Sequence, residues 1–255
     1  MCLIAFAYKA HPKYNLILVA NRDEFYGRPA RPASFWTDEK YPDILAGKDL
    51  EAGGTWMGVH KNGKWAAVTN YRDPSIIKEN PPSRGELVLD YLRGNDSAMD
   101  YLQALTAKAN DYRGFNLLLW DDKSLLHYSN QSKIVNRIEP GIHGLSNALL
   151  NTGWPKVRYA KTALKELSGS ENFEKEELFK LLMNERKAPE EELPVTGIPQ
   201  HLEKAVSSIF IRTESYGTRC SSVLLIDKEG NVDFTERSYK PGTTELIEEK
   251  NFNLE

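Results

Sequence analysis

The sequence predicts an α+β fold of two antiparallel β-sheets between helical layers, a four-layer α-β-β-α sandwich. Three observations support this prediction. Strand-like segments follow one another in hairpins, helical segments fall into two separate blocks, and further strands close the chain. This order lacks the regular strand–helix alternation of a doubly wound or TIM-barrel fold. The length of 255 residues fits one large domain, so a single domain over residues 1–255 is expected.

The first third of the chain contains two predicted hairpins. The apolar segments Cys2–Tyr8 and Leu16–Asn21 flank a turn at His11–Asn15, and continuous apolar runs of this length indicate strands covered on both faces. The segments Trp56–His60 and Trp65–Asn70 flank an Asn-Gly pair. Because such a pair supplies the positive φ angles of a type I′ turn, this second hairpin is strongly indicated.

The middle of the chain mixes irregular and helical segments. Phe35–Ala52 has little periodicity and is expected to be irregular surface. A helix is predicted from Ser83 through Arg93, with Ser83 and Glu86 spaced as a capping box. A second amphipathic helix is predicted over Asp96–Lys108.

The second half returns to strands and then alternates with helices. The expected strands are Phe115–Trp120, Ser124–Ser129, Val135–Ile138, Ile142–Ser146, Ser207–Arg212, Ser221–Asp227 and Val232–Thr235. Two helices are expected at Trp154–Leu167 and Phe173–Asn184, followed by a Pro-punctuated surface loop over Asn184–Gly197. The acidic tail Glu245–Glu255 is expected to be a solvated or frayed end.

Composition excludes several classes of function. A net charge of −3 leaves no basic surplus for a phosphate backbone, so nucleic acid is not an expected partner. No apolar run approaches the ~20 residues that span a bilayer, and the N-terminus lacks the basic region of a signal peptide. A cytoplasmic protein without an integral membrane segment is therefore expected. Cys2 and Cys220 are expected to be free thiols, and scattered histidines predict neither a metal site nor a cofactor.

Cys2 directly follows the initiator methionine. If Met1 is removed, Cys2 carries both a thiol and an α-amine, whose pKa of ~7.7–8.0 lets it accept the thiol proton. The alternative is that Cys2 is an ordinary small residue at the start of a strand. The segment Asn21–Glu24 ends the partner strand, where register could place it beside Cys2. A guanidinium there would stabilise a thiolate and a carboxylate would hold an ammonium, whereas the alternative is an exposed charged turn.

Several separated motifs resemble those of the NRDE family, the family of transport and Golgi organisation protein 2. In order from Met1 to about Asp227 they are MCLI, NRDE, AGKDLEAGGTWMGV, VTNYR, SRG, GLSNALLNTGWPK and SSVLLID. The resemblance implies the N-terminal-nucleophile hydrolase fold with its α-β-β-α sandwich. That implication agrees with the independent order of strands and helices.

A more distant similarity is to the choloylglycine hydrolase and penicillin V acylase branch of that fold. It implies a catalytic set of Cys2, Arg22, Asp23, Asn70, Asn147 and Arg219. Cys2 would be the nucleophile and Asn70 would help to form an oxyanion hole. In that branch the early Arg and Asp are spaced apart, whereas here they are adjacent. Adjacent strand residues point to opposite faces, so either a bulge re-aims one of them or only one faces the site.

Four further residues are expected to contact a substrate: Asn21, Trp56, Tyr71 and Arg84. For Trp56 a place in the core is the alternative, and for Arg84 a surface charge beside a helix cap. Two functions follow. The first is an amidase that cleaves a carbon–nitrogen bond of a small acyl amide. The second is a non-catalytic carrier or chaperone for haem, acyl-lipid or acyl-CoA, because the resembled family is associated with haem trafficking and lipid homeostasis. No haem motif such as CxxCH is present.

Overall fold

A computed structural model describes residues 2–37 and 40–255. The chain divides into two compact units. The first, here called the Cys2 unit, comprises Met1–Gly27, Glu139–Ser146 and Leu150–Glu255. The second, here called the Asn70 unit, comprises Arg28–Ile138 and Asn147–Leu149. Each unit contains one sheet and its own helices, whereas the expectation of one domain over residues 1–255 stays a prediction.

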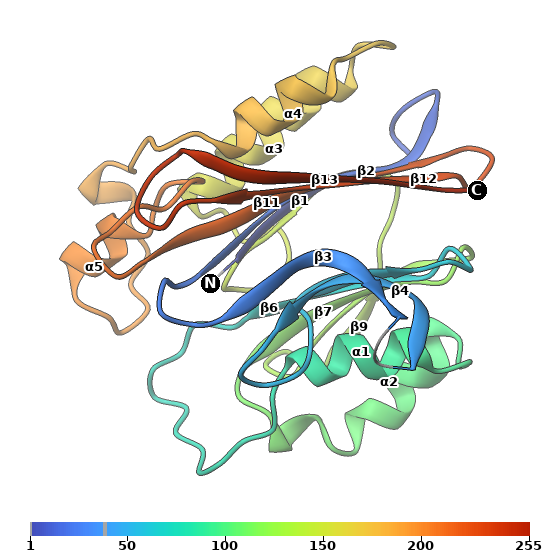
Figure 1. The fold of residues 1–255 in the computed structure, drawn as a ribbon. Coiled ribbons are helices and arrows are strands. Elements are labelled where there is room, and N and C mark those ends of the chain that lie inside the picture. Colours follow the sequence, from blue (N-terminus) through green and yellow to red (C-terminus); the bar gives the residue numbers. More distant parts are fainter. Residues whose placement is uncertain (1, 38–39) are drawn as a thin grey trace. The chain divides into compact units, whose positions relative to one another are not determined.

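The Cys2 unit is built on a six-stranded antiparallel sheet in the order β10-β1-β2-β11-β12-β13. Its strands are β1 (Cys2–Tyr8), β2 (Tyr14–Phe25), β10 (Gly141–Leu145), β11 (Tyr216–Asp227), β12 (Val232–Tyr239) and β13 (Leu246–Leu254). Its helices are α3 (Pro155–Ser168), α4 (Lys175–Leu182), α5 (Gln200–Ala205) and the 3₁₀ turn η3 (Glu190–Glu192). Helices α3 and α4 lie along one face of this sheet (Figure 1).

Alternation along β1 and β2 decides which side chains meet those helices. Leu3, Ile17 and Val19 point to the helical face and pack with residues of α3 and α4. The intervening residues, such as Ile4 and Phe6, are buried as well. Burial on both faces explains why these strands are continuously apolar in sequence.

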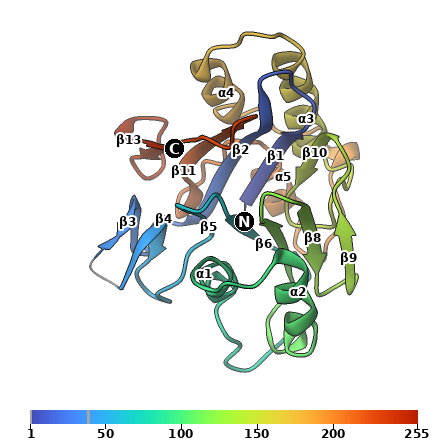
Figure 2. The ribbon, with the colours of Figure 1, turned by 90° about the vertical axis from the view of Figure 1, so that its right-hand side faces the viewer.

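The Asn70 unit is built on a seven-stranded antiparallel sheet whose strands follow one another in chain order. They are β3 (Ala30–Trp36), β4 (Tyr41–Asp49), β5 (Met57–His60), β6 (Trp65–Asn70), β7 (Phe115–Trp120), β8 (Leu125–Ser129) and β9 (Ile134–Arg137). Helices α1 (Gly85–Arg93) and α2 (Ala98–Thr106), followed by the 3₁₀ turn η2 (Ala109–Asp111), pack on this sheet (Figure 2). The predicted α+β class with two antiparallel sheets is thus confirmed.

Two segments expected to lack regular structure are strands. Within Phe35–Ala52 the chain forms the end of β3 and all of β4, and their pairing contains two register shifts. Each shift breaks the two-residue alternation, which is why the sequence predicts no strand there. The tail Glu245–Glu255 contains β13, an edge strand paired only with β12 in the described sheet. Edge strands carry many charges, so this one resembles a solvated end in sequence.

Two other local predictions are wrong. Ser207–Arg212 is not a strand but a mostly buried irregular segment after α5, which the sequence did not predict. Its backbone groups bond to loops and side chains, as when Phe210 N–H donates to the Asn184 carbonyl at 2.8 Å. At α1 the capping residue is Arg84 and no capping box forms. The Ser83 hydroxyl instead accepts from the Gly85 N–H at 3.3 Å.

Among residues 2–37 and 40–255, no helix combines the length and the apolar character needed to cross a membrane.

Candidate active site

Cys2, Arg22 and Cys220 form a row across three neighbouring strands. Cys2 is the first residue of β1 and pairs with Arg22 of β2, which pairs on its other side with Cys220 of β11. Residues directly opposite one another in antiparallel strands project to the same face. The structure therefore brings the predicted nucleophile and the predicted guanidinium together, with the second cysteine beyond them.

Asp23 projects to the opposite face, because β2 continues without a bulge through Phe25. The irregularity lies instead in β11, between Thr218 and Cys220, which places Arg219 at the shift. Of the two alternatives that the sequence left open, no bulge re-aims Arg22 or Asp23. The backbone of Asp23 still contacts the Cys2 sulfur. The Asp23 N–H forms a hydrogen bond with the Cys2 thiol, and this bond lowers the pKa of the thiol.

Burial dominates the protonation of both thiols. Cys2 is half-buried as a residue, and burial of its sulfur raises the pKa of the thiol. The negative charge of Asp23 raises it further, whereas the Arg22 guanidinium lowers it. Burial also raises the pKa of Cys220, well above its ordinary value, and the Glu236 carboxylate adds to this increase. Both cysteines therefore rest as thiols, and the Cys2 thiol needs a proton acceptor before it can attack a carbonyl.

The Asp23 carboxyl lies in a buried polar cluster. It is 1% exposed and accepts a hydrogen bond from the Thr218 hydroxyl at 2.7 Å. Burial raises the pKa of Asp23, while the charge of Lys156 and the Thr218 hydrogen bond lower it. Lys156 is itself 2% exposed and donates to the Val206 carbonyl at 3.2 Å. Lys156 is not evident as a site residue from the sequence, where it is one residue near the start of the predicted helix Trp154–Leu167.

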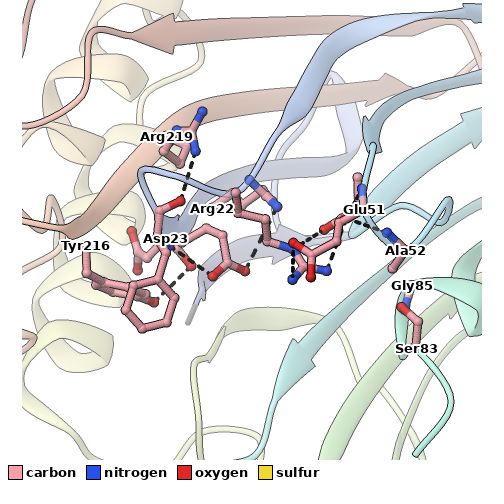
Figure 3. A network of polar contacts seen from close by, with 12 residues as sticks. Arg22, Asp23, Glu51, Ala52, Ser83, Gly85, Tyr216 and Arg219 are labelled. Atoms are coloured by element: carbon pink, nitrogen blue, oxygen red, sulfur yellow. Dashed lines mark hydrogen bonds and ion pairs between the residues drawn. The ribbon is translucent and has the colours of Figure 1, made fainter. Parts of the chain in front are cut away.

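Hydrogen bonds from side chains to backbone carbonyls hold the end of β2 in place (Figure 3). The Tyr216 hydroxyl donates to the Asp23 carbonyl at 2.9 Å, and Arg219 donates to the carbonyls of Phe25 and Tyr26 at 3.0 and 3.2 Å. On the other side of β1, the Ser146 hydroxyl donates to the Cys2 carbonyl at 2.9 Å. Arg219 therefore anchors the end of β2, and Ser146 is a second residue that sequence reasoning did not single out.

Asn21 is part of the fold's internal hydrogen bonding. It is 1% exposed, and its amide nitrogen donates to the carbonyls of Leu182 and Ile209 at 2.8 and 3.0 Å. Its amide oxygen accepts from the Ser221 hydroxyl at 2.6 Å. Because the amide is buried and already bonded on both ends, we do not retain Asn21 among the proposed substrate contacts.

The two predicted asparagines meet within the Asn70 unit. Asn147 is 1% exposed, and its amide nitrogen donates to the Asn70 carbonyl at 2.9 Å. The Asn147 carbonyl in turn accepts from the Arg72 N–H at 2.7 Å. Asn147 thus fixes the end of β6, where Asn70 is the last residue and is half-buried.

Tyr71 and Arg84 converge on one carbonyl. The Tyr71 N–H and an Arg84 guanidinium N–H both donate to the Gly114 carbonyl, at 2.9 and 3.3 Å. Trp56 lies over Gly47, where an added Cβ would fall 2.2 Å from the Trp56 ring. The Trp56 contact supports a packing role for that residue, whereas Tyr71 and Arg84 share a position beside the asparagines.

One of the quoted motifs is held by polar contacts around Glu51 and Ala52 (Figure 3). The Asp49 carboxylate accepts from the N–H groups of Glu51 and Ala52 and pairs with the Arg28 guanidinium at 2.7 Å. The Arg28 guanidinium also pairs with Glu51 at 3.2 Å. The motif AGKDLEAGGTWMGV therefore contains a loop whose conformation is fixed by the hydrogen bonds and ion pair of Asp49.

Within the part of the chain that the structure describes, no three His, Cys, Asp or Glu side chains form a group that could hold a metal ion.

Comparison with known proteins identifies the relatives of this chain. A family model described as Transport and Golgi organisation 2 matches residues 1–241. The Transport and Golgi organization protein 2 homolog of Bos taurus is 37% identical over 261 residues, and the match covers 93% of each chain. The homolog of Homo sapiens is 36% identical over 261 residues with the same coverage. The Drosophila melanogaster protein is 30% identical over 265 residues, covering 93% of this chain and 92% of its own.

Solved structures show the same fold at low identity. A Caenorhabditis elegans ortholog of N-acylethanolamine-hydrolyzing acid amidase aligns with a TM-score of 0.52 over 88% of this chain and 92% of its own, at 11% identity. A mutant conjugated bile acid hydrolase from Clostridium perfringens aligns with a TM-score of 0.50 over 99% and 96%, also at 11% identity. The N-terminal-nucleophile hydrolase fold implied by the motifs is therefore confirmed, and the chain belongs to the Transport and Golgi organisation 2 family.

Proposed function

We propose that this protein is an N-terminal-nucleophile hydrolase that uses Cys2 to cleave the carbon–nitrogen bond of a small acyl amide. The observation that supports this most is the position of Cys2 at the start of β1, opposite Arg22 and hydrogen-bonded to the Asp23 backbone. The fold is shared with proteins named as an acid amidase and a conjugated bile acid hydrolase, and both names describe amide cleavage or hydrolysis.

The reaction begins after removal of Met1 exposes the α-amine of Cys2. The amine takes the thiol proton as the sulfur attacks the substrate carbonyl carbon, and a tetrahedral oxyanion forms. When the carbon–nitrogen bond breaks, the resulting ammonium returns its proton to the leaving amine. The same amine then takes a proton from water, which attacks the thioester and releases the carboxylic acid with regeneration of the thiol.

The surrounding residues have distinct roles in this proposal. The Arg22 charge favours the thiolate as it forms, and an ionised Asp23 holds the protonated amine. The resemblance assigns the Asn70 side chain to the oxyanion and Asn147 to the same reaction. The hydrogen bond from Asn147 to the Asn70 carbonyl supports a role for Asn147 in orienting Asn70. Removing one oxyanion donor lowers kcat by about 10²–10³ in other enzymes, and the same loss is expected for Asn70→Ala.

The proposal is tested by controlling the N-terminus. The chain is produced behind a removable leader, so that site-specific proteolysis generates Cys2 as the first residue. The preparation is assayed before and after cleavage on N-acylethanolamines, glycine-conjugated bile acids and N-acyl nitroanilides of increasing chain length. We expect hydrolysis only after cleavage, because the α-amine does not exist before it.

Three matched variants complete the test. Cys2→Ala should abolish hydrolysis, Cys2→Ser should lose most of it because an alcohol is harder to deprotonate, and Cys220→Ala should retain it. Circular dichroism confirms that each variant is folded. Equal activity before and after leader removal would contradict the proposal. A protein that instead binds haem or acyl-CoA equally well in both forms, without hydrolysis, would behave as the carrier.

A further inference from the structure

Lys156 occupies a place that is unfavourable for an ammonium group. It is the second residue of α3, directly after Pro155, so it lies at the positive end of the helix dipole. It is also 2% exposed, and lysine is seldom buried so fully unless it is paired. Two energetic penalties at one position indicate that a negative group compensates for them.

The Asp23 carboxyl supplies that negative group. Asp23 projects to the helical face of the sheet, on the same side as Val19 and Asn21 of β2. The first turn of α3 covers that face, because Val157, next to Lys156, packs in the same core cluster as Val19. The Lys156 charge acts directly on the Asp23 carboxyl. A buried carboxyl and a buried ammonium are therefore electrostatically coupled at the base of the candidate site, and the ammonium favours the ionised form of the carboxyl.

The buried segment Val206–Ile211 fixes both members of this pair. Its Val206 carbonyl accepts from the Lys156 ammonium at 3.2 Å. Its other end reaches Asp23 through Thr218, whose hydroxyl accepts from the Ile211 N–H at 2.9 Å and donates to the Asp23 carboxyl at 2.7 Å. One irregular segment thus positions the ammonium directly and the carboxylate through a hydroxyl. These hydrogen bonds also explain why Ser207–Arg212, whose apolar residues resemble those of a strand, is irregular in the structure.

We propose that Lys156 is a positioning residue that keeps Asp23 ionised and oriented, so that Asp23 can hold the α-amine of Cys2 during catalysis. This inference rests on the proposed hydrolase function. Without Lys156, the pKa of the buried Asp23 carboxyl rises further, and the protonated carboxyl loses its attraction for the ammonium. The amine is then a weaker base toward the thiol. Because the proposed reaction needs Asp23 in its ionised form, the acid limb of the pH–rate profile follows the raised pKa of Asp23 and moves to higher pH.

The test compares Lys156→Met and Lys156→Arg, with Lys161→Met as the control on the same helix. Lys161 is less buried and bonds to Asn151 at 2.8 Å, away from Asp23. On any amide that the wild type hydrolyses, Lys156→Met should lower kcat/KM about tenfold at pH 7 and shift the acid limb upward by about one pH unit. Lys156→Arg should recover most of the rate, and Lys161→Met should match the wild type.

A second readout needs no substrate. Urea unfolding midpoints are measured at pH 5 and pH 8 for the wild type, Lys156→Met, Asp23→Asn and the double variant. The other charged groups that act on the Asp23 carboxyl are the N-terminal ammonium and Glu24 of β2, and the Cys2 thiol of β1 is coupled to it, whereas Val206–Ile211 contributes none. Lys156→Met should be more destabilised at pH 8 than at pH 5, because removing the partner leaves a buried carboxylate unpaired. In the Asp23→Asn background this pH dependence should disappear.

The outcomes separate the two proposals. If the wild type hydrolyses an amide and Lys156→Met keeps its rate and pH profile, the inference is wrong and the proposed function stands. If the wild type hydrolyses none, the proposed function fails, and the unfolding data still decide whether Lys156 sets the charge of Asp23. A loss of stability that is equal at both pH values and in both backgrounds would mean that Lys156 only fills space.

Discussion

Arg22 stands between two thiols, but its charge does not make either of them a resting thiolate. Burial raises the pKa of Cys2, and Arg22 only partly opposes that effect. A nucleophile held in its protonated form reacts only when a nearby base takes its proton. In the proposed reaction that base is the α-amine that removal of Met1 would expose, and the charge of Arg22 would act chiefly on the thiolate that forms as the proton leaves.

The two cysteines should differ in reactivity. Iodoacetamide should alkylate Cys2 faster than Cys220 at pH 7.5, because Cys220 is 5% exposed and its pKa is raised further. Arg22→Ala should slow the alkylation of Cys2, since it removes the charge that lowers the thiol pKa. Mass spectrometry of the two cysteine peptides measures both rates, with Cys220→Ser as the control. Equal rates at the two sites would mean that Cys2 has only a structural role.

Position in the sequence is what singles out Cys2, Arg22 and Asp23, and the structure places Cys2 opposite Arg22, whereas their catalytic roles stay predictions. Cys2 stands out because it is the second residue, and Arg22 and Asp23 stand out because charges directly follow an apolar strand. Lys156 could not be found in this way. A single lysine at a helix start is common on protein surfaces, and only the tertiary structure shows that this one is buried beside a carboxyl.

At the scale of elements, two glycine motifs are explained by contact between backbones. An added Cβ on Gly54 would lie 2.5 Å from the Gly85 carbonyl carbon, and the Thr55 N–H donates to the Gly85 carbonyl at 3.2 Å. The start of α1 is therefore seated directly on the loop before β5. The motifs GGTW and SRG, separated in sequence, form the two sides of one close approach.

Gly54→Ala should accordingly destabilise the protein by about 1–3 kcal/mol, because backbone atoms rather than a flexible side chain obstruct the new methyl group. Urea unfolding followed by tryptophan fluorescence measures the change. Gly153→Ala is the matched control, since an added Cβ there meets nothing within 4 Å. Identical midpoints for the two variants would show that α1 shifts away from the loop at little energetic cost.

His127 in β8 should make stability depend on pH. Its ring is bonded to Asn116 and Asn136 at 3.2 Å, and burial lowers the pKa of His127 to about 4. The unfolded state therefore binds the extra proton between pH 6.5 and 4, so stability falls as pH decreases through this window, by about 3 kcal/mol in all. His127→Gln should reduce this slope in urea titrations, whereas substitution of exposed His201 should not. An unchanged slope would exclude His127 as its source.

Element prediction failed where edge strands and register shifts weaken the sequence pattern. The hairpins β1–β2 and β5–β6 are evident from a continuous apolar run and from turn residues, respectively, although only Gly63 and not Asn62 has the positive φ that the predicted type I′ turn requires. β13 escaped prediction because its side chains are charged along an edge, as in the Arg237–Glu249 pair at 2.5 Å. Hydrogen bonding to a neighbouring strand, which sequence patterns do not reveal, is what orders it.

At the scale of the whole molecule, the path of the chain differs from that of two domains joined by one linker. The chain passes between the two units at residues 27–28, 138–139, 146–147 and 149–150. The Cys2 unit is therefore assembled from three separate segments, and its six-stranded sheet needs strands from the beginning, middle and end of the sequence. Long-range pairing of this kind costs loop-closure entropy before its contacts form, so neither the beginning nor the end of the chain can complete this sheet alone.

This path predicts that the protein unfolds as one unit, in line with the expected single domain. Four of the five tryptophans, Trp36, Trp56, Trp65 and Trp120, belong to the Asn70 unit, and Trp154 belongs to the Cys2 unit. In a Trp154→Phe variant, fluorescence reports on the Asn70 unit alone, while far-ultraviolet circular dichroism reports on both sheets. The two signals should give one coincident urea transition, the usual criterion for two-state unfolding. Transitions with separate midpoints would instead mean that the units fold as independent domains despite sharing an interleaved chain.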